Sequence, residues 1–176
     1  MMKDSKYEIL KIDFTSNSDY DLFFDIITNK INSIEDIEKS YRKKIIICAV
    51  ELIQNNIIHN CKANSRVEIS KTNDFIILDY IQSTDKQKYE NLIKKIDLVN
   101  KMNFENISLK IKENIENSKS NLGSGNGLLT CRLKTKNFVN IKLIETNSEN
   151  EYKFIIRLKF DCYESTNPSS GKNTIG

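Results

Sequence analysis

The sequence predicts an α+β domain, a two-layer sandwich in which helices cover one face of a mixed, mostly antiparallel sheet. Short segments that alternate apolar and polar residues, typical of half-buried strands, occur mostly in pairs separated by polar turns. Segments with helical spacing of apolar residues lie between those pairs. Strands that pair as hairpins and helices that lie on one face bury their apolar sides against each other. With 176 residues, of which 39% are apolar, the chain can form one domain with a sizeable core.

The first half of the chain predicts one strand, two helices and a hairpin. The strand is Tyr7–Phe14, followed by capping residues at 16–19 and by a helix that ends near Asn32 and Ser33. A longer helix is predicted over residues 35–61. It is apolar on two sides, so we expect it to lie between the sheet and a neighbouring helix. Two strands, 66–70 and 75–81, are joined by a tight turn at 71–74.

The second half predicts a pair of helices, a glycine-rich segment, another helix and a second hairpin. Residues 85–119 are helical with a break near Asn103. A helix follows the glycines and continues to about Thr135. Residues 139–145 and 152–160 then form the second hairpin. The domain is therefore predicted to span 1–162, with a disordered polar tail at 163–176.

Composition excludes several classes of protein. The net charge is only +3, and the lysines are scattered along the chain, so nucleic-acid binding is not predicted. No segment reaches the ~18 consecutive apolar residues of a membrane span, so we expect a cytoplasmic protein without membrane contact. The cysteines form no CxxC pair and are predicted to be reduced thiols rather than metal ligands. They are Cys48, Cys61, Cys131 and Cys162.

A polar stripe on the long helix is the first candidate site. Glu51, Asn55 and His59 recur every fourth residue, which places them on one face of a helix that is otherwise apolar. The Asn55 carbonyl is a hard oxygen ligand suited to Mg²⁺, and Glu51 can accept a proton from an attacking hydroxyl. His59 lies either at the rim of this site or at the structural end of the helix. The alternative for Glu51 and Asn55 is an ordinary exposed helix surface.

Three of the five glycines, Gly123, Gly125 and Gly127, alternate just before an apolar helix. This spacing lets backbone N–H groups approach phosphate, with a helix N-terminus behind them. A flexible linker is the alternative, but linkers do not usually run directly into an apolar helix. Together with the polar stripe, the segment predicts a site for ATP and Mg²⁺. The neighbouring residues included in this site are Ser124, Asn126 and Leu128.

The two motifs resemble those of a known superfamily. The sequence ELIQNNIIHN, with Glu51 and Asn55, resembles the N-box of the GHKL (Bergerat-fold) ATPases, and NLGSGNGLL is similar to their second glycine box. The histidine four residues after Asn55 is similar to bacterial anti-sigma-factor kinases. Residues 92–115 are more similar to SiaB-type serine/threonine protein kinases, in the spacing of Leu92, Ile96, Val99 and Asn100. The resemblance covers about residues 7–160.

The resemblance implies a Bergerat, histidine-kinase-like ATPase fold and a role for each motif residue. Asn55 matches the Mg²⁺ ligand, Glu51 the catalytic base, and the glycines the loop over the phosphates. The adenine-binding Asp of the family lies at the end of the second hairpin strand, where this chain has Asp79. The family pattern Asp-x-Gly-x-Gly is replaced by Asp-Tyr-Ile-Gln-Ser at 79–83, which contains no glycine.

The function implied is an ATP-dependent serine/threonine kinase of the SiaB type. It would transfer the γ-phosphoryl group to a hydroxyl of a small regulatory protein, either SiaC-like or similar to an anti-sigma-factor antagonist. Two alternatives stay open: an anti-sigma-factor-like kinase, and a nucleotide-binding or docking module without phosphotransfer. A histidine kinase carrying its own acceptor is excluded, because the single histidine lies within the predicted site. The sequence does not fix the oligomeric state and leaves a homodimer open.

Overall fold

The computed structural model describes residues 7–15, 20–35, 37–58, 65–117, 125–148 and 151–162. The predicted capping residues at 16–19 and the predicted tail at 163–176 lie outside these ranges. None of the helices in the described ranges is long and apolar enough to cross a bilayer. The elements, in chain order, are β1 (Tyr7–Phe14), α1 (Tyr20–Asn32), α2 (Lys39–Ile58), β2 (Ser65–Lys71), β3 (Phe75–Thr84), α3 (Lys86–Lys101), α4 (Phe104–Asn117), α5 (Gly127–Thr135), β4 (Asn140–Ser148) and β5 (Glu151–Asp161).

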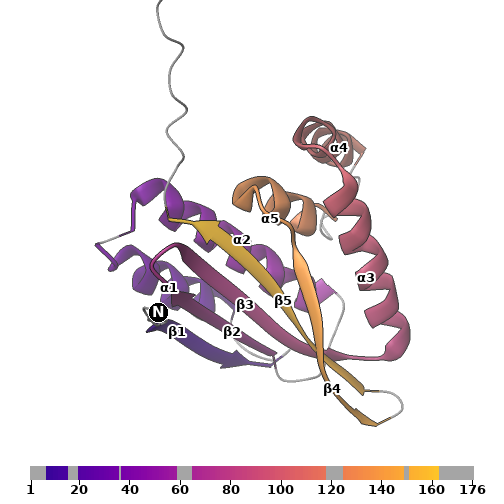
Figure 1. Cartoon of the computed structure of the whole chain (residues 1–176), viewed down its shortest axis with the longest axis horizontal. Coiled ribbons are helices and arrows are strands. Elements are labelled where there is room, and N and C mark those ends of the chain that lie inside the picture. Colours follow the sequence, from indigo (N-terminus) through magenta and orange to yellow (C-terminus); the bar gives the residue numbers. More distant parts are fainter. Residues whose placement is uncertain are drawn as a thin grey trace, which may run out of the picture.

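The five strands form one sheet in the order β1-β2-β3-β5-β4 (Figure 1). Every neighbouring pair of strands is antiparallel. The sequence had predicted a mixed, mostly antiparallel sheet, and the expected parallel pairing was wrong. The reason is the way the hairpins join. The β2–β3 and β4–β5 hairpins meet through β3 and β5, which run in opposite directions, and β1 adds to the free edge of β2 in the same manner.

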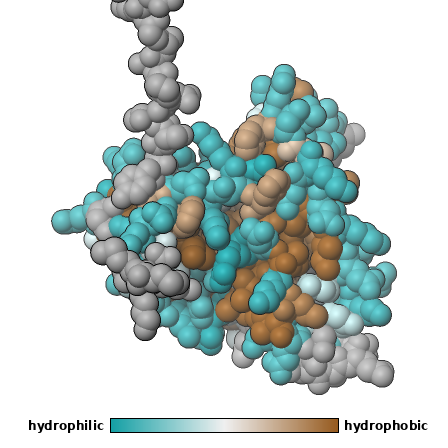
Figure 2. Space-filling view, in the orientation of Figure 1, coloured by the Kyte–Doolittle hydropathy of each residue, from teal (hydrophilic) through white to brown (hydrophobic). Residues whose placement is uncertain are grey.

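The sheet buries one face against the helices. Alternate side chains of β2, β3 and β5 point to that inner face and are almost inaccessible; they include Val67, Ile69, Leu78, Tyr80, Ile156 and Leu158. In Figure 1 helices α1 and α2 lie behind the sheet, on this inner face. Figure 2 looks at the opposite face, where apolar residues are visible among hydrophilic ones. The arrangement is the two-layer α+β architecture that the sequence predicted.

The long helix begins later than predicted. Its first backbone hydrogen bond runs from the N–H of Arg42 to the carbonyl of Glu38, which sets the start of α2 at Lys39 rather than near residue 35. The predicted end at residue 61 lies beyond the described part of the helix. As predicted, α2 is covered on more than one side, because it contacts α1, α5 and strand β3.

Small residues let α2 and α5 approach closely. Cys48 and Ala49 on α2 and Cys131 on α5 are fully buried at this contact. The Cys131 Sγ atom lies 3.9 Å from the carbonyl oxygen of Cys48 and donates to it. Cys48, Cys131 and Cys162 are not joined in disulfides, and Cys61 lies outside the described residues. Short side chains at this crossing bring the N-terminus of α5 onto the surface of α2.

A second, smaller core joins the end of α3 to α4 and α5. It is built from Val99, Ile107 and Leu129, while Leu128 packs against both this cluster and the main core. Ile107 is the only buried side chain that α4 contributes. The helix therefore contributes little to the buried core and is held through its contacts with α5 and its connection to α3.

Candidate functional site

A cavity of about 530 Å³ opens between the two layers. Residues of α2, α3 and the start of α5 form its walls, together with inner-face residues of β3 and β5. Apolar side chains form a large part of the lining; they include Leu52, Tyr80, Leu92, Phe154 and Ile156. The volume lies within the ~300–1,000 Å³ range of pockets that hold small ligands and cofactors. A partly apolar ligand of that size would suit this lining.

The polar edge of α2 meets the glycine segment directly. A Cβ atom built on Gly127 would lie 2.8 Å from Nδ2 of Asn55 and 3.1 Å from Oε2 of Glu51. The first distance is shorter than a methyl group tolerates, so this contact requires glycine unless the Asn55 side chain moves. Glu51, Asn55 and Gly127 all line the cavity. The structure thus brings together two motifs that are about seventy residues apart in the sequence.

Gly125 and Asn126 give the segment its path into α5. Gly125 has φ +69°, in the left-handed region that favours glycine, and both residues line the cavity, as does Leu128. Asn126 is buried, and its Oδ1 atom accepts a 2.7 Å hydrogen bond from Nδ2 of Asn114 on α4. Its side chain makes no capping bond to α5. The first turn of α5 therefore presents N–H groups that a side-chain cap does not occupy.

Burial affects the acid–base properties of Glu51. Its side chain is partly buried in the cavity wall, and the resulting desolvation raises the pKa of the carboxyl group above its usual value. A carboxylate with a raised pKa holds a proton more strongly than an exposed one. Glu51 is therefore better suited to accept a proton than a solvated glutamate would be.

Asp79, the residue expected from the sequence to bind adenine, is not among the residues that line the cavity. Side chains alternate along β3, so Tyr80 and Gln82 line the cavity while Asp79 points to the opposite face of the sheet. There its carboxylate accepts two hydrogen bonds of 2.7 Å from Nε and Nη2 of Arg157 on β5. This pairing raises the pKa of the Arg157 guanidinium. Asp79 thus pairs with Arg157 on the face of the sheet opposite the cavity.

Besides Gln54 on α2, five polar residues of the cavity were missed by the sequence-based prediction: Gln82, Thr84, Lys88, Asn91 and Lys95. The period of two along β3 could have identified the first two, since they share a face with Tyr80. The helical period could have identified the other three, because positions 88, 91, 92 and 95 form one stripe of α3. The Nζ atom of Lys88 also lies 3.4 Å from Oδ2 of Asp85, in an exposed ion pair at the start of α3.

Three predicted site residues, His59, Gly123 and Ser124, lie outside the described residues. Across the ranges that are described, no group of three or more His, Cys, Asp or Glu side chains could hold a metal ion. Asn55 with its neighbour Glu51 can therefore supply only part of a coordination shell. A divalent ion here would need most of its ligands from water or from a bound substrate.

The fold and the cavity define a two-layer α+β domain with a ligand-sized cavity between its helices and an antiparallel sheet. The chain is similar to one chain of the crystal structure of the SiaB–SiaC complex from Pseudomonas aeruginosa. The TM-score is 0.69 at 14% sequence identity, over 87% of this chain and 91% of that chain. At this identity the likeness shows a shared fold. In sequence, no protein-family model and no curated protein matches the chain.

Proposed function

We propose that this chain is an ATP-dependent protein kinase of the SiaB type within the GHKL superfamily. One observation carries the proposal: Gly127, at the N-terminus of α5, lies against Asn55 and Glu51 on the wall of a ligand-sized cavity. A helix N-terminus, a carboxamide oxygen and a carboxylate at one place are suited to a triphosphate with its metal ion. The resemblance of both motifs to GHKL boxes supports the same assignment.

The lining of the cavity fits the parts of Mg-ATP. Asn55 would hold Mg²⁺ through its carbonyl oxygen, while phosphate oxygens and water complete the shell. The N–H groups at the start of α5, with Lys88 and Lys95, would bind the phosphates. The apolar lining would hold the purine ring. Gln82, a buried residue of that lining, offers both a donor and an acceptor for the edge of the base.

The chain's own residues would carry out proton transfer and positioning. Bound Mg-ATP supplies the electrophilic γ-phosphorus and the ADP leaving group. Glu51 would accept the proton of the attacking hydroxyl. The hydroxyl oxygen forms a bond to the γ-phosphorus, and the bond between that phosphorus and the bridging β-phosphate oxygen breaks. The raised pKa of Glu51 moves the carboxyl group toward the operating pH, which favours this role. The other residues contribute by holding the phosphates in line.

The acceptor in this proposal is a hydroxyl on a small regulatory protein. The similar crystal structure is a complex of two proteins, SiaB and SiaC, which supports a protein partner for this chain as well. Whether that partner is SiaC-like or similar to an anti-sigma-factor antagonist depends on the acceptor that is found. A homodimer of the kinase is compatible with either.

Two measurements test the function. Mg-ATP at ~100 times its dissociation constant should raise the free energy of unfolding by roughly 2.7 kcal/mol, which a thermal-shift assay detects. Labelled ATP, incubated with the chain and the purified products of neighbouring genes, should label one small protein. Absence of a shift at millimolar Mg-ATP would favour the docking module, an alternative supported by the lack of glycine after Asp79. A shift without labelling of any protein would argue against the kinase activity alone.

A further inference from the structure

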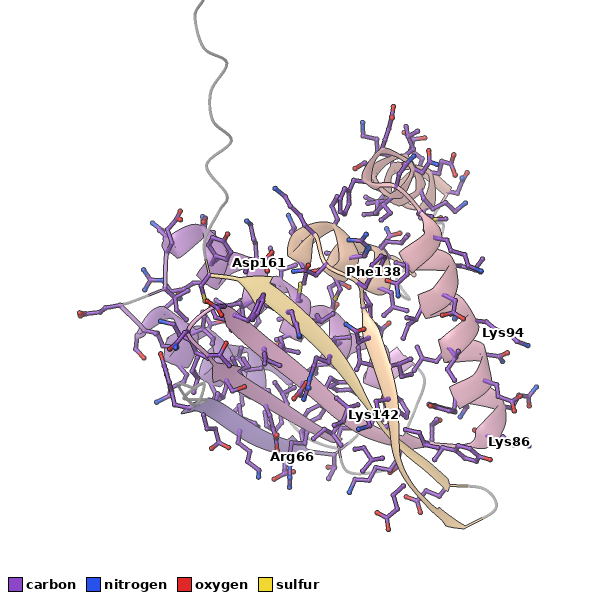
Figure 3. All side chains as sticks on the ribbon, in the orientation of Figure 1. Arg66, Lys86, Lys94, Phe138, Lys142 and Asp161 are labelled. Carbon is purple, nitrogen blue, oxygen red and sulfur yellow. The ribbon has the colours of Figure 1, made fainter. Side chains whose placement is uncertain are left out.

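Arg132 lies in the last turn of α5, outside the lining of the cavity, and only 8% of the residue is exposed. Its guanidinium lies over the rings of two phenylalanines. The guanidinium carbon is 4.6 Å from the ring centre of Phe104 and 4.9 Å from that of Phe138. Phe104 begins α4, and Phe138 lies in the connection between α5 and β4, where Figure 3 labels it. We call these three residues the aromatic–arginine stack.

The guanidinium in this stack has unmet hydrogen-bonding capacity. Its Nε and Nη1 atoms are buried, and neither has a hydrogen-bond acceptor among the residues that the structure describes. Within the described ranges no carboxylate lies within salt-bridge distance of Arg132. Desolvation lowers the pKa of the guanidinium, since no anion offsets it. The two rings stabilise the positive charge but offer no hydrogen-bond acceptor in the plane of the guanidinium for its N–H groups.

Arg157 provides a comparison within the same molecule, because its guanidinium is hydrogen-bonded to a carboxylate. Its Nε and Nη2 atoms each donate a 2.7 Å hydrogen bond to the Asp79 carboxylate. That pairing raises the pKa of the Arg157 guanidinium, opposite in direction to Arg132. The two arginines differ because one has an anionic partner in the part of the chain that the structure describes and the other does not. An anionic partner for Arg132 would therefore lie outside the described residues, and a bound protein is one source of such an anion.

The rings that cover Arg132 are themselves at the surface. Phe104 is 41% exposed and Phe138 is 59% exposed, both high values for phenylalanine side chains. The guanidinium therefore lies close to the protein surface, beside two apolar rings that solvent reaches. A desolvated arginine framed by exposed aromatic rings has the composition found at the centre of protein–protein interfaces. A free inorganic anion would pair with the charge but would leave the rings exposed.

We propose that the aromatic–arginine stack is a docking site for a partner protein that presents an Asp or Glu side chain beside apolar residues. The carboxylate accepts two hydrogen bonds from the fork of Arg132, and the apolar neighbours cover Phe104 and Phe138. The proposal does not rest on kinase activity, since none of the three residues lines the cavity. It does place the partner on α5, the helix whose first residue, Gly127, contacts Glu51 and Asn55.

A binding selection tests the chemistry of the partner. A displayed library of random 12-residue peptides is selected on the whole protein and counter-selected on the Arg132→Met variant. We expect the retained peptides to be enriched in Asp or Glu next to apolar residues. Their affinity should fall about tenfold or more in Arg132→Met and also in Phe138→Ala. Peptides without acidic enrichment, or binding equally well to Arg132→Met, would overturn the proposal.

A stability measurement distinguishes docking from a purely structural role. If Arg132 serves to bind a partner, Arg132→Met should leave the melting temperature of the free protein unchanged or raise it. The reason is that the substitution removes a desolvated and unpaired charge. The matched control is Arg157→Met, which should lower the melting temperature since Asp79 loses its partner. Equal losses in the two variants would make Arg132 structural and refute the proposal. So would a dimer, seen by sedimentation equilibrium, that Arg132→Met converts to a monomer.

Discussion

The side-chain amide of Asn100 forms two hydrogen bonds with the backbone of Val139. Its Nδ2 atom donates to the Val139 carbonyl oxygen over 2.9 Å, and the Val139 N–H donates to its Oδ1 atom over 3.0 Å. Val139 is 1% exposed and directly precedes β4. Asn100 lies in the last turn of α3, the helix that carries one wall of the cavity. The pair therefore fixes that wall relative to the sheet.

Replacing Asn100 with Ala should lower the free energy of unfolding by about 1–3 kcal/mol, because the buried backbone groups of Val139 lose their partners. Urea denaturation measures the change, with the neighbouring exposed Lys101→Ala as the control. The Asn100→Asp variant should also lose stability, since a carboxylate cannot donate to the Val139 carbonyl. A loss no larger than that of Lys101→Ala would show that these hydrogen bonds contribute little.

Gly127→Ala should lower both stability and affinity for Mg-ATP. The added methyl group would lie within 2.8 Å of Asn55 Nδ2, so Asn55 or α5 must shift, at a cost of about 1–3 kcal/mol. Gly125→Ala is the matched control. Its Cβ meets no atom within 4 Å, so that variant should lose only the ~1 kcal/mol of a strained left-handed backbone. Calorimetric titration compares the two. Equal affinities of the Gly127→Ala and Gly125→Ala variants for Mg-ATP would show that Gly127 has no specific role in nucleotide binding.

Glu51→Gln should reduce phosphoryl transfer by about 10²-fold or more and leave nucleotide binding in place. It should also stabilise the free protein at neutral pH. Burial raises the pKa of Glu51 in the folded state, so the wild type is favoured at low pH and loses this contribution as the pH rises through the folded pKa. The stabilising effect of the variant should therefore shrink as the pH is lowered toward 4. Melting temperatures of both proteins between pH 4 and pH 8 provide the check, and a constant difference would contradict it.

Asp79→Asn should reduce stability and spare nucleotide affinity, because Asp79 faces away from the cavity. Loss of the paired carboxylate should cost roughly 1–2 kcal/mol, since the Arg157 side chain is 40% exposed and water screens part of the interaction. Gln82→Leu should do the opposite and weaken binding of the base. The two variants are compared by denaturation and by titration with Mg-ATP. If the Asp79→Asn protein is folded but no longer binds Mg-ATP, Asp79 contributes to nucleotide binding.

Lys95→Ala should weaken binding of ATP by about tenfold if its ammonium group contacts phosphate. Lys94→Ala is the control, because Lys94 is also exposed on α3 but points away from the sheet (Figure 3) and does not line the cavity. The difference between the variants should decrease as salt is added, since screening weakens the contact. Equal affinities at low salt would exclude Lys95 from phosphate binding.

The sequence predicted the elements well because hydrophobic periodicity is a local property. The strand Tyr7–Phe14 and the break between α3 and α4 were found at their observed places. Other features depend on which side of the sheet a residue faces. Asp79 follows a run of apolar residues, so its neighbours did not show that it points to Arg157 rather than to the cavity. Arg132 could not be predicted as buried, since Phe104 reaches it from another helix.

The small core beneath α4 has a consequence for how the molecule opens. Ile107 is the single buried side chain of that helix, whereas β3 is buried along most of its length. Segments with few buried apolar contacts separate from the native state at lower free energy than the whole domain. Amide protons of α4 should therefore exchange with solvent sooner than those of β3. Opening of α4 would then leave the sheet and the cavity wall intact, because no residue of α4 lines the cavity.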